Sequence, residues 1–361
     1  CGARLRRGLR RGRLRLRRGL RRGRLRLRRR LRRGKFLALD RLGSDHSRRT
    51  RRRIPDWRRR TASGANGWIG ITADTNDAEA DVPEGDTIFR AARTLHRALA
   101  GKTVRSFASV LPALNRVHED APLTGRTIER VSAAGKHLLM HLSGDLVLRT
   151  HMRMNGSWHI YRPGERWRRP RRDMRLTIAT EDFEAVGFNI PVAELIASRD
   201  LPRHEELRRL GPDVLSDNFD EHEARRRLRE RGDMPAAEAL LNQRLIAGLG
   251  NVYKSEVLFL AGVNPFTPVR MLAESQITSV LGIARRVLLA NVIDGVAPMT
   301  TYTGFRRTTG RADPQQRLWV YGRARLPCRR CGTPIGVRKQ GLDARLTYWC
   351  PQCQPTTETN A

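Results

Sequence analysis

The sequence contains few cysteines and no long apolar stretch. Only five cysteines occur in 361 residues, and four of them gather near the C-terminus. A secreted disulfide scaffold spreads its cysteines along the chain, so that class of protein is excluded. No run reaches the roughly 18 apolar residues that a membrane helix needs. The basic N-terminus also leads into no apolar signal segment. We therefore expect a cytoplasmic protein that has no contact with a membrane.

Acidic residues are scarce as well. Lys and Arg number 71 against 36 Asp and Glu, which gives a net charge of +35. Residues 1–81 hold 28 basic and 7 acidic residues, and residues 82–361 hold 43 and 29. A folded region this basic commonly binds a polyanion, because neutralising phosphates releases condensed counterions. The charge is also compatible with a soluble protein that is simply basic.

The first 81 residues differ from the rest of the chain. The motif "RLRRGLRRGRL" at 4–14 repeats at 15–25 and begins again at 26. Recurrent Gly and closely spaced Arg oppose order, so we expect a disordered extension. A nucleic-acid-binding tail or a transit peptide would explain it. We favour translation of DNA upstream of the true start.

After residue 82 a helix and then several strands are predicted. Ile88, Ala91, Leu95 and Leu99 recur at helical spacing, and Gly101 ends the pattern. Short strand-like runs follow, separated by turn signals: "TIERVSA", "KHLLMHL", "DLVLRTHM", "MRLTIAT" and "FEAVGF". One helix followed by many short strands favours a β-sandwich or barrel.

From about residue 207 the pattern becomes helical. Asp220 is placed to cap one helix and Pro235 to begin another. Gly248 and Gly250 mark a sharp turn before a third helix, and "ESQITSVLGIARRVLLANVI" predicts a long one. Basic residues such as Lys254 and Arg338 are expected to form general basic surface.

The late cysteines have the spacing of a metal site. Cys328 and Cys331 form one CxxC pair, and Cys350 and Cys353 form a second one 18 residues later. Two such pairs joined by a β-hairpin bring four thiolates onto one Zn²⁺. Zinc binding supplies folding energy that so small a module lacks. We expect one structural zinc ion and no redox cofactor.

These blocks together resemble the formamidopyrimidine-DNA glycosylase/endonuclease VIII family, in its actinobacterial endonuclease VIII-type branch. The matching stretches are "PEGDT", "GKHLL", "THMRMNGSW", "LLNQRLIAGLGNVYKSEVLF", "TTGRADPQQRLWVYGRA" and the cysteine segment. The resemblance implies an α+β multidomain fold with three parts. They are an N-terminal β-sandwich with a flanking helix at 82–203, a helical domain with a helix-two-turn-helix motif at 204–312, and a zinc-finger β-hairpin within 313–361.

The resemblance also implies an N-terminal catalytic proline. Val82 stands at the family's initiator position, and a GTG codon reads as Met when it initiates, so we expect the natural start at Val82. Pro83 would then supply a secondary amine that forms a Schiff base with the damaged sugar. An internal Pro83 cannot do so, because its nitrogen is a tertiary amide. On its own, Pro83 reads as a helix-starting proline.

Other roles are carried over in the same way. Glu84 resembles the general acid/base, although it could equally be a first-turn carboxylate. Lys136 resembles the strand lysine that assists base loss, although a lone Lys is usually solvated. Asp86 and Thr87 depart from other branches, where this pair often ends in Glu.

The implied DNA contacts come from three segments. Arg153, Met154 and Asn155 match the residues that fill the void left by a flipped nucleotide. Without the resemblance, "MNGS" reads as an ordinary hairpin turn. Phosphate contacts are implied for His151, Asn251 and Arg345, and Asn251 could otherwise be a helix N-cap.

The resemblance implies a bifunctional DNA glycosylase/AP lyase of base excision repair. It would be a monomer that binds damaged double-stranded DNA at the nucleoid and removes oxidised pyrimidines. Two alternatives keep the fold: a DNA-binding protein without lyase activity, if Pro83 is internal, or a purine-specific glycosylase. A zinc-ribbon RNA-binding protein is a weaker alternative, because it leaves "PEGDT" and "GLGN" without a purpose.

Overall fold

The structure is a computed structural model that describes residues 82–293, 306–311 and 313–356. The predicted extension at 1–81 lies outside the described residues. Within the described ranges no helix is both long and apolar enough to cross a membrane.

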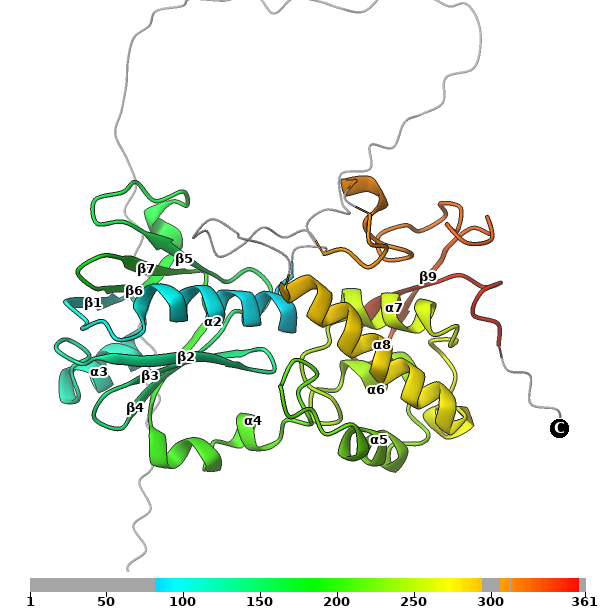
Figure 1. Cartoon of the computed structure of the whole chain (residues 1–361), viewed down its shortest axis with the longest axis horizontal. Helices are drawn as coiled ribbons and strands as arrows, with labels where there is room; N and C mark the ends of the chain where they lie inside the picture. The colour runs from blue at the N-terminus through cyan, green and yellow to red at the C-terminus, as the bar shows by residue number, and fades with distance from the viewer. Residues whose placement is uncertain (1–81, 294–305, 312, 357–361) are drawn as a thin grey trace, which may run out of the picture. The chain divides into compact units, whose positions relative to one another are not determined.

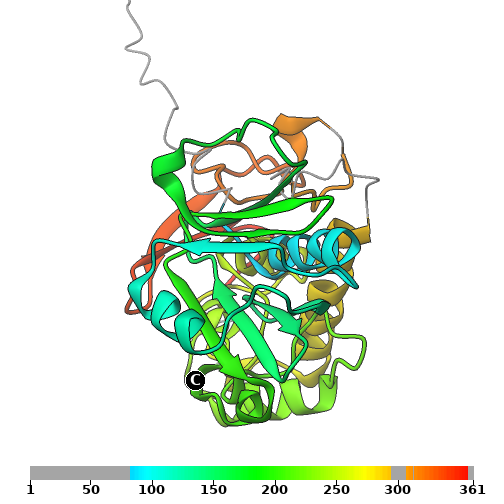
Figure 2. The same ribbon diagram turned by 90° about the vertical axis from the view of Figure 1, so that its left-hand side faces the viewer.

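Two antiparallel four-stranded sheets make up the first part of the fold (Figures 1 and 2). One has the order β1-β6-β7-β5, and the other has the order β2-β3-β4-β8. The strands are β1 (Ser106–Ser109), β2 (Ile128–Ala134), β3 (His137–Leu142), β4 (Leu146–His151), β5 (Ser157–Tyr161), β6 (Met174–Ala179), β7 (Glu184–Phe188) and β8 (Val192–Ala197). Every residue of β3 is buried, including His137 and His141, and α2 packs against this strand.

Helix α2 (Gly85–Leu99) runs between the two sheets (Figure 1). Its apolar stripe, including Ile88, Leu95 and Leu99, is buried in the core of the sheets. The helix ends as predicted before Gly101, whose φ of 78° is the left-handed conformation that glycine adopts without strain. Because α2 also packs against α8 (Glu274–Ile293), the first residues of the domain lie where sheets and helices meet.

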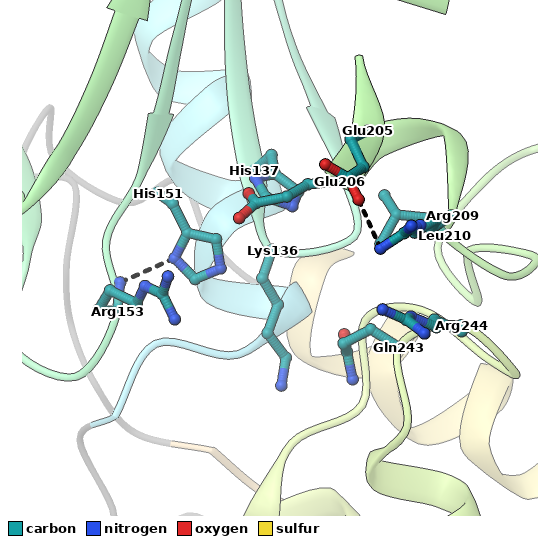
Figure 3. A pocket seen from close by; sticks show the side chains of 10 residues that line it. All are labelled: Lys136, His137, His151, Arg153, Glu205, Glu206, Arg209, Leu210, Gln243 and Arg244. Atoms are coloured by element: carbon teal, nitrogen blue, oxygen red, sulfur yellow. Dashed lines mark hydrogen bonds and ion pairs between the residues drawn. The ribbon is translucent and has the colours of Figure 1, made fainter. Parts of the chain in front are cut away.

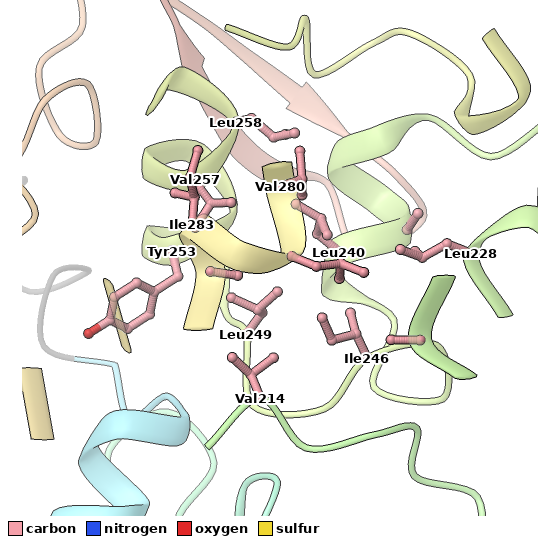
Figure 4. Packing of buried hydrophobic residues seen from close by; sticks show 14 of the residues in the cluster. Val214, Leu228, Leu240, Ile246, Leu249, Tyr253, Val257, Leu258, Val280 and Ile283 are labelled. Carbon is pink, nitrogen blue, oxygen red and sulfur yellow. The ribbon is translucent and has the colours of Figure 1, made fainter. Parts of the chain in front are cut away.

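The helical part has its own core (Figure 4). It consists of α4 (Glu205–Arg208), α5 (Glu221–Glu230), α6 (Ala236–Leu241), α7 (Asn251–Leu260) and α8. The predicted cap of α5 is confirmed, because the Asp220 carboxylate accepts a hydrogen bond from Glu223 N at 2.8 Å. Helix α7 is buried nearly all round, since α8 and α6 cover one side and the C-terminal hairpin covers the other.

The C-terminal hairpin pairs β9 (Gly336–Gln340) with β10 (Arg345–Trp349). It packs on α7 through a small apolar cluster that includes Val252, Phe259 and Tyr348. The predicted α+β fold with two sheets, helices and a four-cysteine hairpin is therefore confirmed. Strands β1, β5 and β8, which lie at sheet edges, and helix α3 (Pro112–Asp120) were not predicted.

Candidate active site and nucleic-acid interface

The Glu84 carboxylate sits on the N-terminus of α7. Its Oε1 accepts a hydrogen bond from Val252 N at 2.8 Å and its Oε2 accepts one from Tyr253 N at 3.4 Å. Glu84 is the N-cap residue of α2 but makes no side-chain bond to that helix. Glu84 thus stabilises a helix N-terminus, as a first-turn carboxylate would. The helix is α7, however, which begins 167 residues later in the chain, and not α2. The bonds fix a carboxylate that is only 1% exposed.

Two glycine contacts allow this close approach. Gly85 N donates to Gly248 O at 2.8 Å, and a Cβ on Gly85 would lie 2.7 Å from that oxygen. A Cβ on Gly250 would lie 2.2 Å from Glu84 Cδ. Both glycines of "GLGN" therefore contact the site. Gly248 accepts the hydrogen bond from Gly85 N, and any side chain at 250 would displace the Glu84 carboxylate from α7.

Behind Glu84 lies a buried ion pair that the sequence did not reveal. Arg306 Nε is 3.2 Å from Asp86 Oδ1, and the two side chains are 3% and 0% exposed. Arg306 Nη2 donates to Thr87 Oγ1 at 3.1 Å and to Val82 O at 2.7 Å. Because Val82 O belongs to the amide that holds Pro83 N, this guanidinium lies within about 5 Å of that nitrogen.

Lys136 occupies the tight turn between β2 and β3 and lines a cavity of about 390 Å³. Figure 3 shows its side chain reaching into this cavity, between His151 and Arg153 on one side and Gln243 and Arg244 on the other. Burial lowers the pKa of Lys136 to about 8; the Glu84 carboxylate opposes this shift and Arg306 adds to it. The amine is therefore poised to change charge near neutral pH.

His151 is held in one tautomer. Its Nδ1 accepts a hydrogen bond from Arg153 N at 3.0 Å, so the proton of the neutral ring lies on Nε2. Burial, aided by the charges of Arg153 and Lys136, lowers the pKa of His151 to about 4. A neutral ring with a fixed N–H in this cavity is suited to donate a hydrogen bond to a phosphate oxygen.

Arg153, Met154 and Asn155 project from the turn between β4 and β5. All three are exposed, and Gly156 N closes the turn on Met152 O at 2.9 Å. Arg153 has a φ of 52°, an uncommon conformation for a residue other than glycine. Met154 is 42% exposed although it is large and apolar. The hairpin turn and the void-filling role are thus compatible, because the turn is the platform for exposed side chains.

Asn251 is the first residue of α7 and not its cap, which is Gly250. Its Nδ2 lies 3.4 Å from the Tyr321 hydroxyl. Tyr321 is held in place by the Glu256 carboxylate, which accepts hydrogen bonds from the backbone N–H groups of Trp319, Val320 and Tyr321 at 2.8, 2.9 and 2.8 Å. Burial raises the pKa of Glu256. An amide and a phenol thus meet at a helix N-terminus, which suits an anion.

The expectation that Lys254 lies on basic surface is wrong. The residue is 1% exposed, and its Nζ donates to Leu346 O at 3.0 Å and to Thr347 Oγ1 at 2.9 Å. These bonds tie α7 to the strand that carries Arg345. Arg345 Nη1 lies 3.7 Å from Met154 Sδ, so the hairpin tip meets the turn between β4 and β5. Arg338 is exposed, as predicted.

The four cysteines form a closed cluster. Their sulfur atoms all lie within 4.8 Å of one another, with Cys328–Cys353 at 3.9 Å and Cys331–Cys350 at 3.4 Å. Four thiolates at about 2.3 Å from a tetrahedral zinc lie about 3.8 Å apart, so the cluster fits this ion. Arg330 N and Cys353 N each point at a sulfur at 3.4 Å, which favours the thiolate form.

Chelating the zinc should unfold the hairpin and abolish DNA binding. Without the metal the cluster of thiolates loses its cross-link, and Arg345 loses its support. We expect loss of affinity for an abasic-analogue duplex after treatment with a strong chelator, with recovery on adding Zn²⁺. Persistent binding by protein shown by elemental analysis to be free of zinc would contradict a structural role.

The structure brings most of the predicted site residues together. Glu84, Lys136, Arg345 and the turn at 153–155 lie around one region between the sheets and the helices. Sequence reasoning missed Arg306, Tyr321, Gln243, Arg209 and Arg244, of which the last three line the cavity of Lys136. Only Gln243 and Arg244, in the block "LLNQRLIAGLGNVYKSEVLF", stood in a stretch that carries the resemblance.

Three family models match consecutive parts of the chain. The formamidopyrimidine-DNA glycosylase N-terminal domain matches residues 82–190, its H2TH domain matches 210–302, and the zinc finger found in FPG and IleRS matches 325–356.

Named relatives and solved structures agree with these models. The "Probable endonuclease 8 2" of Streptomyces coelicolor is 42% identical over 276 residues, covering 76% of this chain and 94% of that protein. The "DNA-(apurinic or apyrimidinic site) lyase Nei2" of Mycolicibacterium smegmatis is 36% identical over 274 residues, covering 76% and 99%. Lactococcus lactis Fpg bound to DNA with an oxidized pyrimidine superposes with a TM-score of 0.65 at 27% identity, covering 76% of this chain and 100% of that one.

The family models and the relatives thus cover most of residues 82–356. This part of the chain contains Glu84 at the N-terminus of α7, the cavity lined by Lys136, the exposed turn and the four-cysteine hairpin. The chain belongs to the formamidopyrimidine-DNA glycosylase/endonuclease VIII family, as an endonuclease VIII-type DNA glycosylase and AP lyase of base excision repair.

Proposed function

We propose that this protein removes oxidised pyrimidines from duplex DNA and cleaves the resulting abasic site through a Schiff base on Pro83. The observation that carries the proposal is the position of Pro83. It is buried next to Glu84, whose carboxylate binds the N-terminus of α7, and it lies within about 5 Å of a buried guanidinium.

The chemistry requires Pro83 to be the first residue of the active polypeptide. Its secondary amine would attack C1′ of the damaged nucleotide, and the base would leave with a proton. The iminium that forms acidifies the C2′ proton, so that the 3′ phosphate leaves by β-elimination. A second elimination would release the 5′ phosphate. The N-terminal family model begins to match at residue 82, which supports a start at this point.

Glu84 and Lys136 supply the proton transfers in this proposal. The Glu84 carboxylate is fixed by two backbone N–H groups and adjoins Pro83, so it can pass a proton to the opening sugar. Lys136 would hold a phosphate near the lesion while protonated and assist base loss. Its lowered pKa suits a group that changes protonation state at neutral pH.

The exposed turn supports the preference for pyrimidine lesions. Arg153, Met154 and Asn155 would fill the gap left by the flipped nucleotide, and unbranched Met154 suits an irregular gap. His151, Asn251 and Arg345 would bind flanking phosphates. We further propose that one structural zinc suffices and that the monomer is the active unit, because all of these groups come from one chain.

Borohydride trapping on abasic-site DNA tests the mechanism. Borohydride reduces an iminium to a stable amine, so a covalent complex is expected for a polypeptide beginning at Pro83 after removal of the initiator. The full-length chain should give none unless it is trimmed. No covalent product from either form would support the alternative of a DNA-binding protein without lyase activity. Release of thymine glycol rather than 8-oxoguanine from defined duplexes tests the specificity.

The charge of Lys136 gives a pH prediction. Its lowered pKa means that the protonated form is lost as pH rises through about 8. Affinity for an abasic-analogue duplex should therefore fall above pH 8 in the parent protein. Lys136→Arg stays charged, so its affinity should hold across that range. An identical alkaline decline in both proteins would show that another group is responsible.

A further inference from the structure

The loop that joins β5 to β6 (Figure 1) is strongly basic, and none of its residues belongs to the proposed lesion site. Its residues 162–173 contain six arginines and two acidic residues. The arginines are Arg162, Arg166, Arg168, Arg169, Arg171 and Arg172, and all but Arg169 are exposed. We call them the arginine loop.

No ion pair neutralises this loop in the described part of the chain. Elsewhere, buried or half-buried arginines such as Arg149 and Arg227 pair with carboxylates. Of the two acidic residues in the loop, Glu165 accepts a hydrogen bond from Arg162 N at 3.0 Å and so fixes the backbone. Several like charges within a few residues repel one another, and a bound polyanion removes that cost.

The loop is anchored and not merely basic. Trp167 is half-buried: its indole N–H donates to Glu184 Oε2 at 2.9 Å, and its ring meets Phe188 edge-on at 5.7 Å. Arg168 N donates to the Tyr161 hydroxyl at 3.1 Å. The Arg171 guanidinium lies over the Trp167 ring, 5.1 Å from its centroid. These contacts hold the backbone while the guanidinium groups remain outside.

The loop surrounds a hollow of about 550 Å³. Arg166, Arg168, Arg169 and Arg171 line it, together with Glu165, Trp167 and Pro170. Rigid forks of donors around a groove suit phosphate oxygens, and preorganisation lowers the entropy lost on binding. The chemistry therefore favours a phosphate backbone over a protein partner, whose carboxylates would have to match this spacing.

Strand β5 sets the distance between the arginine loop and the turn proposed to lie at the lesion. The turn with Met154 precedes β5, and Arg162 follows its last residue, Tyr161. Five residues of strand span about 17 Å, which equals about five base pairs of duplex. For a duplex that runs along β5, a damaged nucleotide at the turn therefore places the loop about half a helical turn away.

We propose that the arginine loop binds the backbone of double-stranded DNA about half a helical turn from the lesion. The site would act as a second clamp that adds affinity and salt dependence and leaves the chemistry unchanged. This inference rests on DNA as the substrate but not on the Schiff base, so the two can fail separately.

A thermodynamic cycle on duplexes of one length tests this. The variant Arg166→Gln/Arg168→Gln/Arg171→Gln is compared with Arg93→Gln/Arg97→Gln/Arg116→Gln, which removes the same charge from exposed positions on α2 and α3. Each protein binds an abasic-analogue duplex with ordinary phosphates or with uncharged methylphosphonates about four to seven pairs from the lesion. Binding is measured across a range of KCl concentrations.

The loop variant should bind the ordinary duplex less tightly, with a salt slope reduced by about 0.9 for each phosphate that the protein no longer neutralises. Methylphosphonates should weaken the parent and the control variant but not the loop variant. The single-turnover rate at saturating enzyme should be equal in all three proteins. Additive effects of protein and DNA changes would overturn the proposal, as would equal reductions of affinity in the two variants. A loop variant that binds like the parent would overturn it as well.

Discussion

Replacing Glu84 with Gln should slow base release about 10²- to 10⁴-fold, the range typical for loss of a general acid/base. The carboxylate accepts hydrogen bonds from Val252 N and Tyr253 N, one on each oxygen. A Gln offers a single acceptor and turns an amide N–H toward a second donor. Cleavage of preformed abasic sites should suffer less, because that sugar opens spontaneously in water. Single-turnover rates on both substrates measure the difference.

The affinity of Glu84→Gln for an abasic-analogue duplex should stay close to that of the parent. Glu181→Gln is the matched control, because it removes the same charge from a side chain that is 79% exposed. The control should keep full activity. An equal slowing of base release and of abasic-site cleavage, with a matching loss of affinity, would mean that Glu84 supports the fold rather than the proton transfer.

Replacing Arg306 with Met should cost about 3–5 kcal/mol of folding free energy, because it leaves the Asp86 carboxylate buried with weaker support. Arg90 Nη2 lies 3.4 Å from Asp86 Oδ2 and would compensate only in part. The double variant Asp86→Asn/Arg306→Met removes both charges and should recover much of the stability. Denaturant unfolding of the two single variants and the double variant gives the coupling energy.

The same variant should change the pH dependence of the lyase reaction. The guanidinium lies within about 5 Å of Pro83 N and opposes protonation of a free amine there. Removing this positive charge should make protonation of the amine easier, so the acid limb of the pH–rate profile should move to higher pH. Arg306→Lys keeps the charge and should keep the parent's profile. An unshifted profile in Arg306→Met would limit Arg306 to a structural role.

Local patterns predicted most of the fold correctly. Helical spacing located α2, because a buried stripe repeats with the helical period, and the glycine turn marked the start of α7. The two CxxC pairs predicted a cluster that the structure confirms, since the ligands of such a site are close in sequence. The edge strand β1 escaped prediction because it is short and only partly buried, and the edge strand β8 because all of its residues are only partly buried.

Side chains whose partners are distant in sequence were predicted poorly. The sequence alone predicts a surface position for Lys254, because most lysines are solvated, and only the hairpin packed on α7 provides its acceptors. Arg306 carried no signal at all, since its partner Asp86 lies 220 residues away. The sequence shows that Asp86 and Thr87 differ from the residues at these positions in other branches of the family. Only the structure shows that both side chains contact Arg306.

The sequence by itself determined the family, the order of the three parts and the metal-binding cysteines, because these depend on local spacing and on matched blocks. The tertiary structure alone decided what surrounds Pro83: a carboxylate fixed by another helix and a guanidinium returning from the far end of the helical part. The physical reason is that a buried charge is costly unless it is paired. Its partner can come from any part of the chain that the fold brings near, so no local sequence pattern identifies it.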